Sequence, residues 1–393
     1  MTVHHCAIAA GNYLPRALTL FRSLRAHQPT SQLTVLVLDG SADHLPPVDG
    51  LSIITPGALP IDGEEFLDLA AIYDVVELAT AMKPLLLETM VREHGSVAYL
   101  DSDMYVVSPL EELATELDAS GGVLLTPHFL HPIEPDSERI TEVHCLTVGY
   151  FNLGFCATNR SALPFLHWWW GHLRNECLDY PLLGLFVDQK WVDVGSRLFP
   201  SSTLGHPGYN IGPWNVHERR LEGPASAPRL AATQQPARLL HFSGFDAADP
   251  RAFSSRLNIG LRGVTEADET LARLCDRYAD ELRRASAELG PLPPYRFATD
   301  TTGRRLSTPV RRAFRKDRLD GLEPPSPFRA AAAADFDRWR RSRRLLAGAQ
   351  VAADAAIAAK YVFPDHYRRI TRLAPHSFRR VRAALLRSGR VRR

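Results

Sequence analysis

Two aspartates stand one residue apart in the stretch SVAYLDSDMYVV, which covers residues 96–107. The apolar run before them is typical of a buried strand, so Asp101 and Asp103 are expected where the chain leaves the hydrophobic core. At about 5 Å and an effective dielectric of about 20, two carboxylates repel each other by roughly 3 kcal/mol. Side chains at positions i and i+2 of an extended chain project to the same side, and a hard cation such as Mg²⁺ or Mn²⁺ prefers oxygen ligands. We therefore predict that this pair holds a divalent cation.

The segments around this pair alternate between strand-like and helix-like patterns. Short aliphatic runs predict strands at residues 3–10, 33–40, 51–55 and 96–100, and apolar residues at helical spacing predict helices at 12–29 and 72–95. In the second helical segment Pro84 marks a break or kink and Gly95 marks the end. This alternation predicts the α/β class, with a Rossmann-like, doubly wound and mostly parallel sheet that binds ligands beyond the carboxyl ends of its strands. The two aspartates fall at that edge, although Asp and Ser also favour a solvated turn before a helix at 109–117.

The composition of the 393 residues, 45% of them hydrophobic, is that of a globular protein. The five cysteines are odd in number, scattered and without a CxxC pair, so we expect a reducing compartment and neither a disulfide framework nor a zinc site. The chain opens without a basic and then apolar leader, and it contains no apolar run of about 18 residues. We therefore expect a cytoplasmic protein.

The pattern changes after about residue 250 to helices joined by proline-rich segments. We place a domain boundary at residue 260, with the sheet domain at 1–260 and a helical, arginine-rich extension at 261–393. Residues 331–393 carry 15 Arg and one Lys against four Asp, a net charge of +12 that leaves −10 for the first 330 residues.

Several segments, in the order found here, resemble those of a known family. They are AIAAGNYLPRALTLFRSL, Lys83, YLDSDMYVV, YFNLGF, VDQKWVD, GYNIGPWNV and LLHFSG, and they span about residues 3–250. The series resembles the family 8-type glycosyltransferases, the glycogenin and bacterial lipooligosaccharide galactosyltransferase group. The resemblance implies a GT-A fold, a nucleotide sugar, usually a UDP-sugar, as donor, and Mn²⁺ held by Asp101, Asp103 and His241. Taken alone, His241 is more typical of a core or strand-end histidine.

The resemblance also implies which residues hold the donor. The loop AAGNYL would hold the base and the ribose through Ala9, Ala10, Asn12 and Tyr13. Asn12 is equally typical of a residue that caps the following helix. Ser102 would contact the ribose through its backbone, and Lys83 matches a basic position that approaches the donor sugar or its phosphate. The alternative for Lys83 is an exposed lysine on a helix.

Three residues match positions that line the donor sugar and the reaction centre in similar enzymes: Asn152, Asp188 and Gln189. Asp188 is alternatively a surface acid of a helix, and Asn152 a turn residue at the end of a strand. The resemblance implies retention of configuration, with the leaving phosphate taking the acceptor proton. An inverting enzyme would instead need a carboxylate base, for which the candidates are Asp136, Glu138 and Glu142.

The chain departs from the family pattern after HFSG. Similar enzymes often have a Lys-Pro-Trp-like segment there, whose lysine reaches the diphosphate, whereas this chain reads FDAADPRAFSSR. Arg251 or Arg256 is the expected substitute, because the guanidinium fork suits phosphate.

Two further groups of residues have a structural or an acceptor-side interpretation. Trp168, Trp169 and Trp170 are consecutive on a predicted helix and so face different directions, which favours packing over sugar stacking. His128 and His131 lie in a predicted loop without a strong metal spacing, and we interpret them as candidate acceptor-side contacts.

Two interpretations of the basic tail stay open. A basic amphipathic segment can lie on an anionic membrane, here at its inner face, which would suit a lipid-linked acceptor. The other interpretation is a solvated helix whose arginines reflect coding bias, since the chain has four lysines and 42 arginines. Nucleic-acid binding is not predicted, because the tail lacks interleaved aromatic or glycine-rich elements.

Together these patterns predict a metal-dependent glycosyltransferase that moves a sugar from a nucleotide donor to a glycan, glycolipid or other envelope-related acceptor in a bacterium. The first alternative is a HAD-type phosphatase, whose nucleophile also lies in a strand-DxD motif. That motif expects Thr or Val where this chain has Tyr105, and it belongs to the first strand of the fold. The second alternative is a nucleotide- or glycan-binding protein that keeps the fold without turnover.

Overall fold

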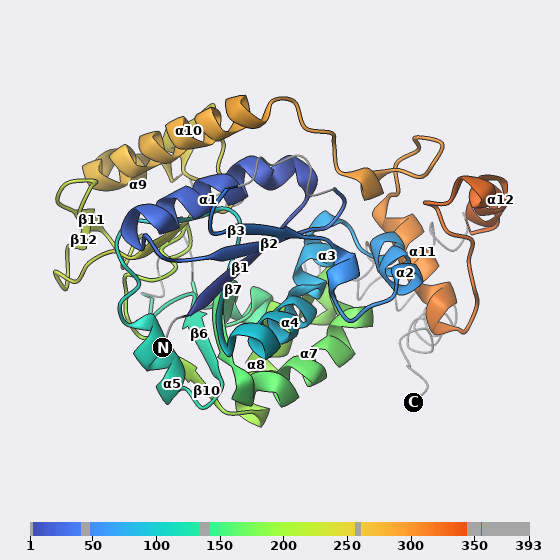
Figure 1. Ribbon diagram of the computed structural model, residues 1–393, viewed down its shortest axis with the longest axis horizontal. Coiled ribbons are helices and arrows are strands. Elements are labelled where there is room, and N and C mark those ends of the chain that lie inside the picture. Colours follow the sequence, from blue (N-terminus) through green and yellow to red (C-terminus); the bar gives the residue numbers. More distant parts are fainter. Residues whose placement is uncertain (1–2, 41–47, 134–140, 256–260, 344–354, 356–393) are drawn as a thin grey trace, which may run out of the picture. The chain divides into compact units, whose positions relative to one another are not determined.

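The computed structural model describes residues 3–40, 48–133, 141–255, 261–343 and 355 (Figure 1). The chain divides into two compact units, Met1–Asp62 with Ala79–Arg296, and Gly63–Leu78 with Phe297–Arg393. Among the described residues, no helix has both the length and the apolar character that a membrane crossing requires.

A seven-stranded sheet forms the centre of the first unit. In spatial order its strands are β10 (Ser201–Thr203), β6 (Val123–Pro127), β7 (Phe151–Asn159), β4 (Ser96–Leu100), β1 (His4–Ala9), β2 (Leu33–Val37) and β3 (Leu51–Ile54). Neighbouring strands pair in parallel, except that β7 is antiparallel to both β4 and β6. Strands β1, β2 and β4 are buried along their whole length, as their aliphatic sequences predict. The predicted α/β class with a mostly parallel sheet is confirmed.

The order of the strands reverses at β1, which defines where ligands bind. The chain runs from β1 outward to β2 and β3, and then returns to place β4 on the other side of β1. In open α/β sheets the crevice lies at such a reversal, beyond the carboxyl ends of the strands. The loop after Ala9 and the turn after Leu100 therefore border one crevice.

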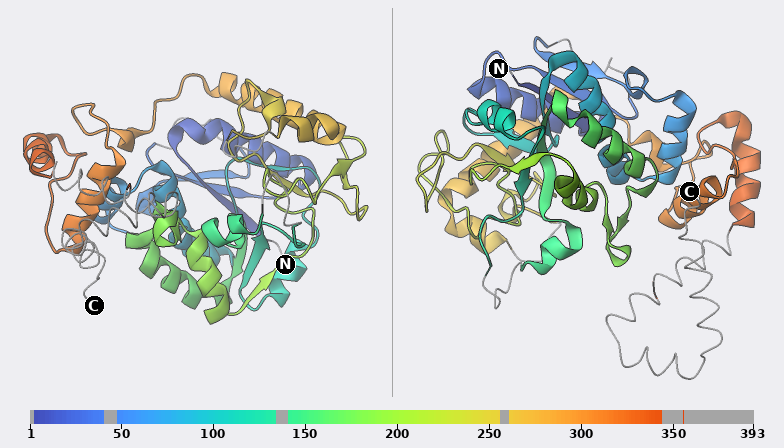
Figure 2. Two further views of the ribbon diagram at one scale, coloured as in Figure 1. Left: turned by 180° about the vertical axis from the view of Figure 1, so that it is seen from behind. Right: turned by 90° about the horizontal axis from the view of Figure 1, so that it is seen from below.

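Helices cover both faces of this sheet. The helices of the first unit are α1 (Leu14–His27), α4 (Lys83–His94), α5 (Leu113–Ala119), α6 (Val143–Val148), α7 (Leu163–Glu176), α8 (Gln189–Leu198), α9 (Arg262–Ala267) and α10 (Glu269–Leu289). Helix α1 covers one face with α10 packed against it, and α4, α7 and α8 cover the other (Figures 1 and 2). The predicted apolar stripe of α1 is buried and belongs to the core cluster under the sheet: Leu14, Leu18, Phe21 and Leu24.

The helical pattern at 72–95 breaks where proline predicts it. Helix α3 (Val75–Ala81), which contains the boundary between the units, ends just before α4 begins at Lys83. Pro84 lies in the first turn of α4, where its missing N–H costs no helical hydrogen bond. Gly95 ends α4 at φ +84°, a conformation that glycine adopts without strain.

Short antiparallel pairs complete the first unit. They are β5 (Met104–Val106) with β13 (Leu239–His241), β8 (Asp179–Tyr180) with β9 (Leu185–Phe186), and β11 (Leu221–Glu222) with β12 (Arg229–Leu230). The first of these pairs joins segments that are more than 130 residues apart and sets His241 opposite Met104. This pairing brings the end of the HFSG segment to the turn that carries the two aspartates.

The described part of the second unit is helical. It contains α2 (Gly63–Ile72), α11 (Thr308–Leu319) and α12 (Ala333–Ser342). Helices therefore follow residue 260, as predicted, while the division at residue 260 itself stays a prediction. The basic segment at 366–393, on which the membrane interpretation depends, lies outside the described residues.

A buried arginine holds the second unit together. Arg311 is 3% exposed, and its guanidinium donates hydrogen bonds at 2.6 Å to the carbonyl oxygens of Ala70, Tyr73 and Phe297. The first two carbonyls lie at the end of α2, where no helical N–H is available to them. Arg311 therefore supplies the donors that this helix end lacks.

We expect Arg311→Met to lower the free energy of unfolding of the second unit by about 3 kcal/mol, because buried carbonyls lose their donors. Lys316→Met on the same helix is the control, since that partly exposed residue makes a surface ion pair with Asp320. Urea unfolding followed by hydrogen exchange in α2 and α11 measures the loss. Equal losses in the two variants would contradict the assigned role.

Candidate active site

Asp101 and Asp103 lie in a turn between β4 and β5, so the extended geometry that we assumed for them is wrong. The backbone N–H of Met104 donates to the carbonyl of Asp101 at 2.9 Å and closes the turn. The N–H of Asp101 in turn donates to the carbonyl of Gly154 at 2.8 Å. The turn nevertheless brings the two carboxylates together, and both remain partly exposed.

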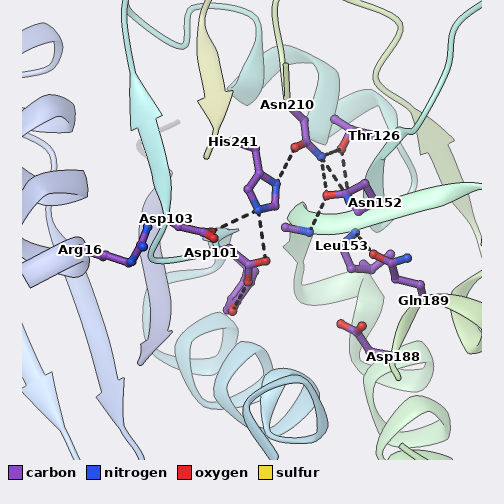
Figure 3. Close-up of polar contacts among 12 residues, drawn as sticks. Arg16, Asp101, Asp103, Thr126, Asn152, Leu153, Asp188, Gln189, Asn210 and His241 are labelled. Carbon is purple, nitrogen blue, oxygen red and sulfur yellow. Dashed lines mark hydrogen bonds and ion pairs between the residues drawn. The ribbon is translucent and has the colours of Figure 1, made fainter. Parts of the chain in front are cut away.

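His241 faces both carboxylates from the end of β13. Its Nε2 lies 3.1 Å from Oδ1 of Asp103 and 3.8 Å from Oδ2 of Asp101 (Figure 3). One ligand atom from each of the three residues lies within 4.8 Å of the other two. The histidine is buried while the carboxylates reach solvent, so the cluster is supported from inside and open on its outer side.

Hydrogen bonds behind the imidazole fix its tautomer. Nδ2 of Asn210 donates to the backbone carbonyl of Asn152 at 3.3 Å and to its Oδ1 at 3.0 Å. Oδ1 of Asn210 must then face Nδ1 of His241, 3.1 Å away. An amide oxygen can only accept, so Nδ1 carries a proton, and Nε2 is the nitrogen that faces the two carboxylates. A divalent cation between these three groups fits this donor set. The hydrogen bond from Nδ1 of His241 to Asn210 orients the ring toward that position.

The network continues from Asn152 to His128. Oδ1 of Asn152 accepts from the N–H of Gly154 at 3.1 Å, and its Nδ2 donates to Nε2 of His128 at 3.3 Å. Nδ1 of His128 then donates to the carbonyl of Tyr150 at 3.2 Å. Burial, helped by the neighbouring His144, lowers the pKa of His128 to about 3, so the ring stays neutral. At 2% exposure His128 supports the network from behind, whereas His131 is exposed.

Gly154 in β7 allows the imidazole to sit where it does. A Cβ at this position would lie 2.2 Å from Cε1 and 2.5 Å from Nδ1 of His241. Both distances are far below van der Waals contact, and the edge of Trp214 closes the ring in from another side, with ring centroids 5.0 Å apart. The ring therefore has no room to yield to a larger residue at 154.

Lys83 is buried beneath the cluster, so its interpretation as an exposed helix lysine is wrong. Its Nζ lies 2.8 Å from Oδ2 of Asp188 and 3.6 Å from Oδ1 of Asp101, and it donates to the carbonyl of Leu153 at 2.8 Å. Burial lowers the pKa of Lys83, but Asp101 and Asp188 outweigh that effect and raise it, so the ammonium stays charged. The hydroxyl of Tyr99 donates to the same Oδ1 of Asp101 at 2.7 Å. One oxygen of Asp101 is thus held by Lys83 and Tyr99, and the other faces His241.

The residues predicted for the reaction centre are also buried. Asp188 is 1% exposed at the start of α8, which excludes its interpretation as a surface acid. The amide of Gln189 accepts from the N–H of Leu153 at 3.4 Å and donates to the carbonyl of Val148 at 3.0 Å. Lys83 and Gln189 therefore both bind the backbone of Leu153, next to Gly154. Figure 3 shows Asp188 and Gln189 on one side of the cluster and Arg16 on the other.

The predicted base-binding loop borders the crevice described above. Ala9 ends β1, Ala10 follows it, and Asn12 lies inside the short 3-10 helix η1 (Gly11–Tyr13). The N-cap of α1 is Tyr13, which makes no side-chain cap, so Asn12 does not cap this helix. Tyr13 is 45% exposed, and Ser102 is buried in the aspartate turn. The roles of these residues toward a nucleotide stay predictions.

Of the two predicted substitutes for the missing lysine, only Arg251 is described, and it is paired elsewhere. Arg251 pairs with Asp276 at 2.6 Å, and Arg256 lies outside the described residues. The sequence reasoning missed Arg16, whose guanidinium points toward Asp103 in Figure 3. It also missed Asn210 and Gly154, although both stand inside segments that carried the family resemblance.

The prediction that the tryptophans serve helix packing is confirmed for two of them. Trp169 is fully buried, and its indole N–H donates to the carbonyl of Asp188 at 3.3 Å. Trp168 packs against Phe165 and Trp191, with ring centroids 6.2 Å away in each case.

Comparisons with known proteins give one sequence relative and several structures. No family model matches the chain. The uncharacterized protein YfnF of Bacillus subtilis (strain 168) is 27% identical over 259 residues, which cover 62% of this chain and 82% of that protein. Among solved structures, the galactosyltransferase LgtC in complex with donor and acceptor sugar analogs has a TM-score of 0.43 and 16% identity, and covers 74% of this chain and 98% of its own. Mouse xyloside xylosyltransferase 1 has a TM-score of 0.37 and 13% identity over 61% of this chain and 97% of its own. Similarities of this size do not define the activity, which has to be inferred from the site.

We expect Gly154→Ala to weaken Mn²⁺ binding at least tenfold, because the new methyl group displaces the His241 ring from both carboxylates. Isothermal titration of the purified protein with Mn²⁺ measures the affinity. Gly171→Ala is the matched control, since a Cβ there meets nothing within 4 Å, and it should bind Mn²⁺ as the wild type does. Unchanged Mn²⁺ affinity in Gly154→Ala would show that the histidine is not a ligand.

Proposed function

We propose that this chain is a metal-dependent glycosyltransferase with a GT-A fold. It would move a hexose from a nucleotide sugar, most simply a UDP-sugar, to a glycan, lipid-linked or other envelope-related acceptor in a bacterium. The observation that carries the proposal is the cluster of Asp101, Asp103 and His241 at the strand-order reversal, with Nε2 of the imidazole facing both carboxylates. The loop at 9–13 enters the same crevice, where a nucleotide would lie across the carboxyl ends of β1 and β4.

Asp101, Asp103 and His241 would hold the cation. A set of two carboxylates and one imidazole suits Mn²⁺, with Mg²⁺ as the second choice because Mg²⁺ prefers oxygen ligands alone. When bound, the cation neutralises the negative charge that grows on the diphosphate as its bond to the sugar breaks. Lys83 and Tyr99 would hold the oxygen of Asp101 that the cation does not use.

The transfer would break the bond between the sugar carbon C1 and the diphosphate oxygen, and form a bond from C1 to an acceptor hydroxyl. We propose retention, with the acceptor proton passing to the leaving diphosphate oxygen. Among the candidate bases of an inverting enzyme, Glu142 accepts the N–H of Ile133 at 2.8 Å, and that hydrogen bond lowers its pKa. A low pKa makes Glu142 a poor base, while Asp136 and Glu138 lie outside the described residues.

The remaining predicted residues would bind and orient the donor. Ala9, Ala10, Asn12, Tyr13 and the backbone of Ser102 would hold the base and ribose, and Asn152, Asp188 and Gln189 would line the sugar. Asp188 needs the charge of Lys83 to remain ionised in its buried position. We place the catalytic domain at 1–260 and assign the extension at 261–393 to acceptor or membrane contact at the inner face of the membrane.

A donor-hydrolysis screen over UDP-, GDP- and TDP-sugars, with and without Mn²⁺, tests the proposal. We expect Mn²⁺-dependent release of one nucleoside diphosphate. Asp103→Asn should slow this release about a thousandfold, which corresponds to a loss of about 4 kcal/mol of transition-state stabilisation. Asp118→Asn, an exposed aspartate on α5, is the matched control and should retain full activity.

Four other outcomes of these assays would contradict the proposal. Release without Mn²⁺, or full activity of Asp103→Asn, would remove the role of the metal cluster. Release of phosphate from phosphomonoesters would favour a phosphatase. Tight binding of a nucleotide sugar with no turnover against any acceptor would favour a binding protein.

A further inference from the structure

Arg16 lies between the predicted base-binding loop and the metal cluster. It belongs to the first turn of α1, and its Nη2 donates to the carbonyl of Phe245 at 2.8 Å. Its guanidinium carbon lies 5.4 Å from the centroid of the Tyr13 ring, and its Nη1 is 3.5 Å from the hydroxyl of Tyr278. Figure 3 shows the guanidinium pointing toward Asp103. The side chain is partly exposed, so the remaining N–H donors can reach a ligand at the cluster.

The charge balance of the cluster predicts a positively charged side chain where a diphosphate would bind. The carboxylates of Asp101 and Asp103 neutralise a divalent ion, which leaves the negative charges of a bound diphosphate without a partner. Lys83 is committed to Asp188 at 2.8 Å, and Arg251 to Asp276 at 2.6 Å. Among the described residues Arg16 is not paired in this way, because its hydrogen bonds go to a carbonyl and a hydroxyl, and neither acceptor carries a full charge.

We propose that Arg16 binds the diphosphate of the nucleotide sugar, on the outer side of the cation at Asp103, in the place of the lysine that the HFSG segment lacks. This inference rests on the proposed function. A guanidinium presents its donors in a planar fork that matches phosphate oxygens. Because the carbonyl of Phe245 and the ring of Tyr13 already hold the fork in position, little conformational freedom is lost when the anion binds.

A structural role is the alternative for Arg16. Its contacts with Phe245 and Tyr278 tie α1 to the segment after HFSG and to α10. Loss of those contacts alone would lower the stability of the protein, and it would leave the affinity for a small anion unchanged. Anion affinity therefore separates the two roles.

The test measures binding of inorganic diphosphate to the full-length protein in the presence of Mn²⁺, by isothermal titration. We expect Arg16→Gln to bind diphosphate about 10- to 100-fold more weakly than the wild type, while its affinity for Mn²⁺ alone changes less than threefold. Arg16→Lys keeps the charge without the fork and should lose about fivefold. Arg22→Gln is the matched control, because Arg22 lies on the same helix and pairs with Glu288 on the surface.

Equal diphosphate affinity of Arg16→Gln and the wild type would overturn the inference. If Arg16→Gln does not fold, Arg16→Lys carries the test, and wild-type affinity in that variant overturns it as well. These results would leave the proposed function intact, provided that the wild type binds diphosphate with Mn²⁺. If the wild type does not bind diphosphate and the screen shows no release of nucleoside diphosphate, the proposed function itself is contradicted.

Discussion

The site depends on one arrangement, the approach of Nε2 of His241 to the carboxylates of Asp101 and Asp103. Two carboxylates that face one another repel unless a positive charge lies between them. The surrounding structure maintains this arrangement, since Asn210 fixes the proton on the far nitrogen and Gly154 leaves space for the ring.

The charges around the cluster are ordered in a way that suits an anionic ligand bound after a cation. Asp101, Asp103 and Asp188 stand against Lys83 and Arg16, which gives a net charge of −1 in this group. A divalent ion changes that sum to +1. The group therefore attracts a cation first and an anion only afterwards, because the local field reverses sign when the metal binds.

Apolar spacing predicted the local parts of this site, whereas the meeting of His241 with the two aspartates was expected only from the family resemblance. The strand before Asp101, the break at Pro84 and the stripe of α1 follow from apolar spacing and from proline geometry, which act between near neighbours in the chain. Residues 101–103 form a turn and not the extended segment that we expected, because the strand that follows them, β5, pairs with β13. That pairing could not be predicted from apolar spacing, and it places His241 beside the two aspartates. In the sequence Arg16 looks like any other helix arginine. Only its position near Asp103 and Phe245 in the folded chain distinguishes it.

The two sides of the cluster differ in how far their side chains are buried. On the histidine side, buried amides and a neutral His128 form a connected network in which each group fixes the next. Low polarity strengthens such bonds and makes a misplaced group costly, so the ligand geometry for the cation is fixed in advance. On the other side Arg16 is held by a carbonyl and an aromatic face, and it remains partly exposed. A diphosphate gains negative charge as its bond to the sugar breaks, and a guanidinium already held beside it would stabilise that charge. Buried support on the histidine side and a partly exposed guanidinium on the other would therefore suit the proposed transfer from a nucleotide sugar.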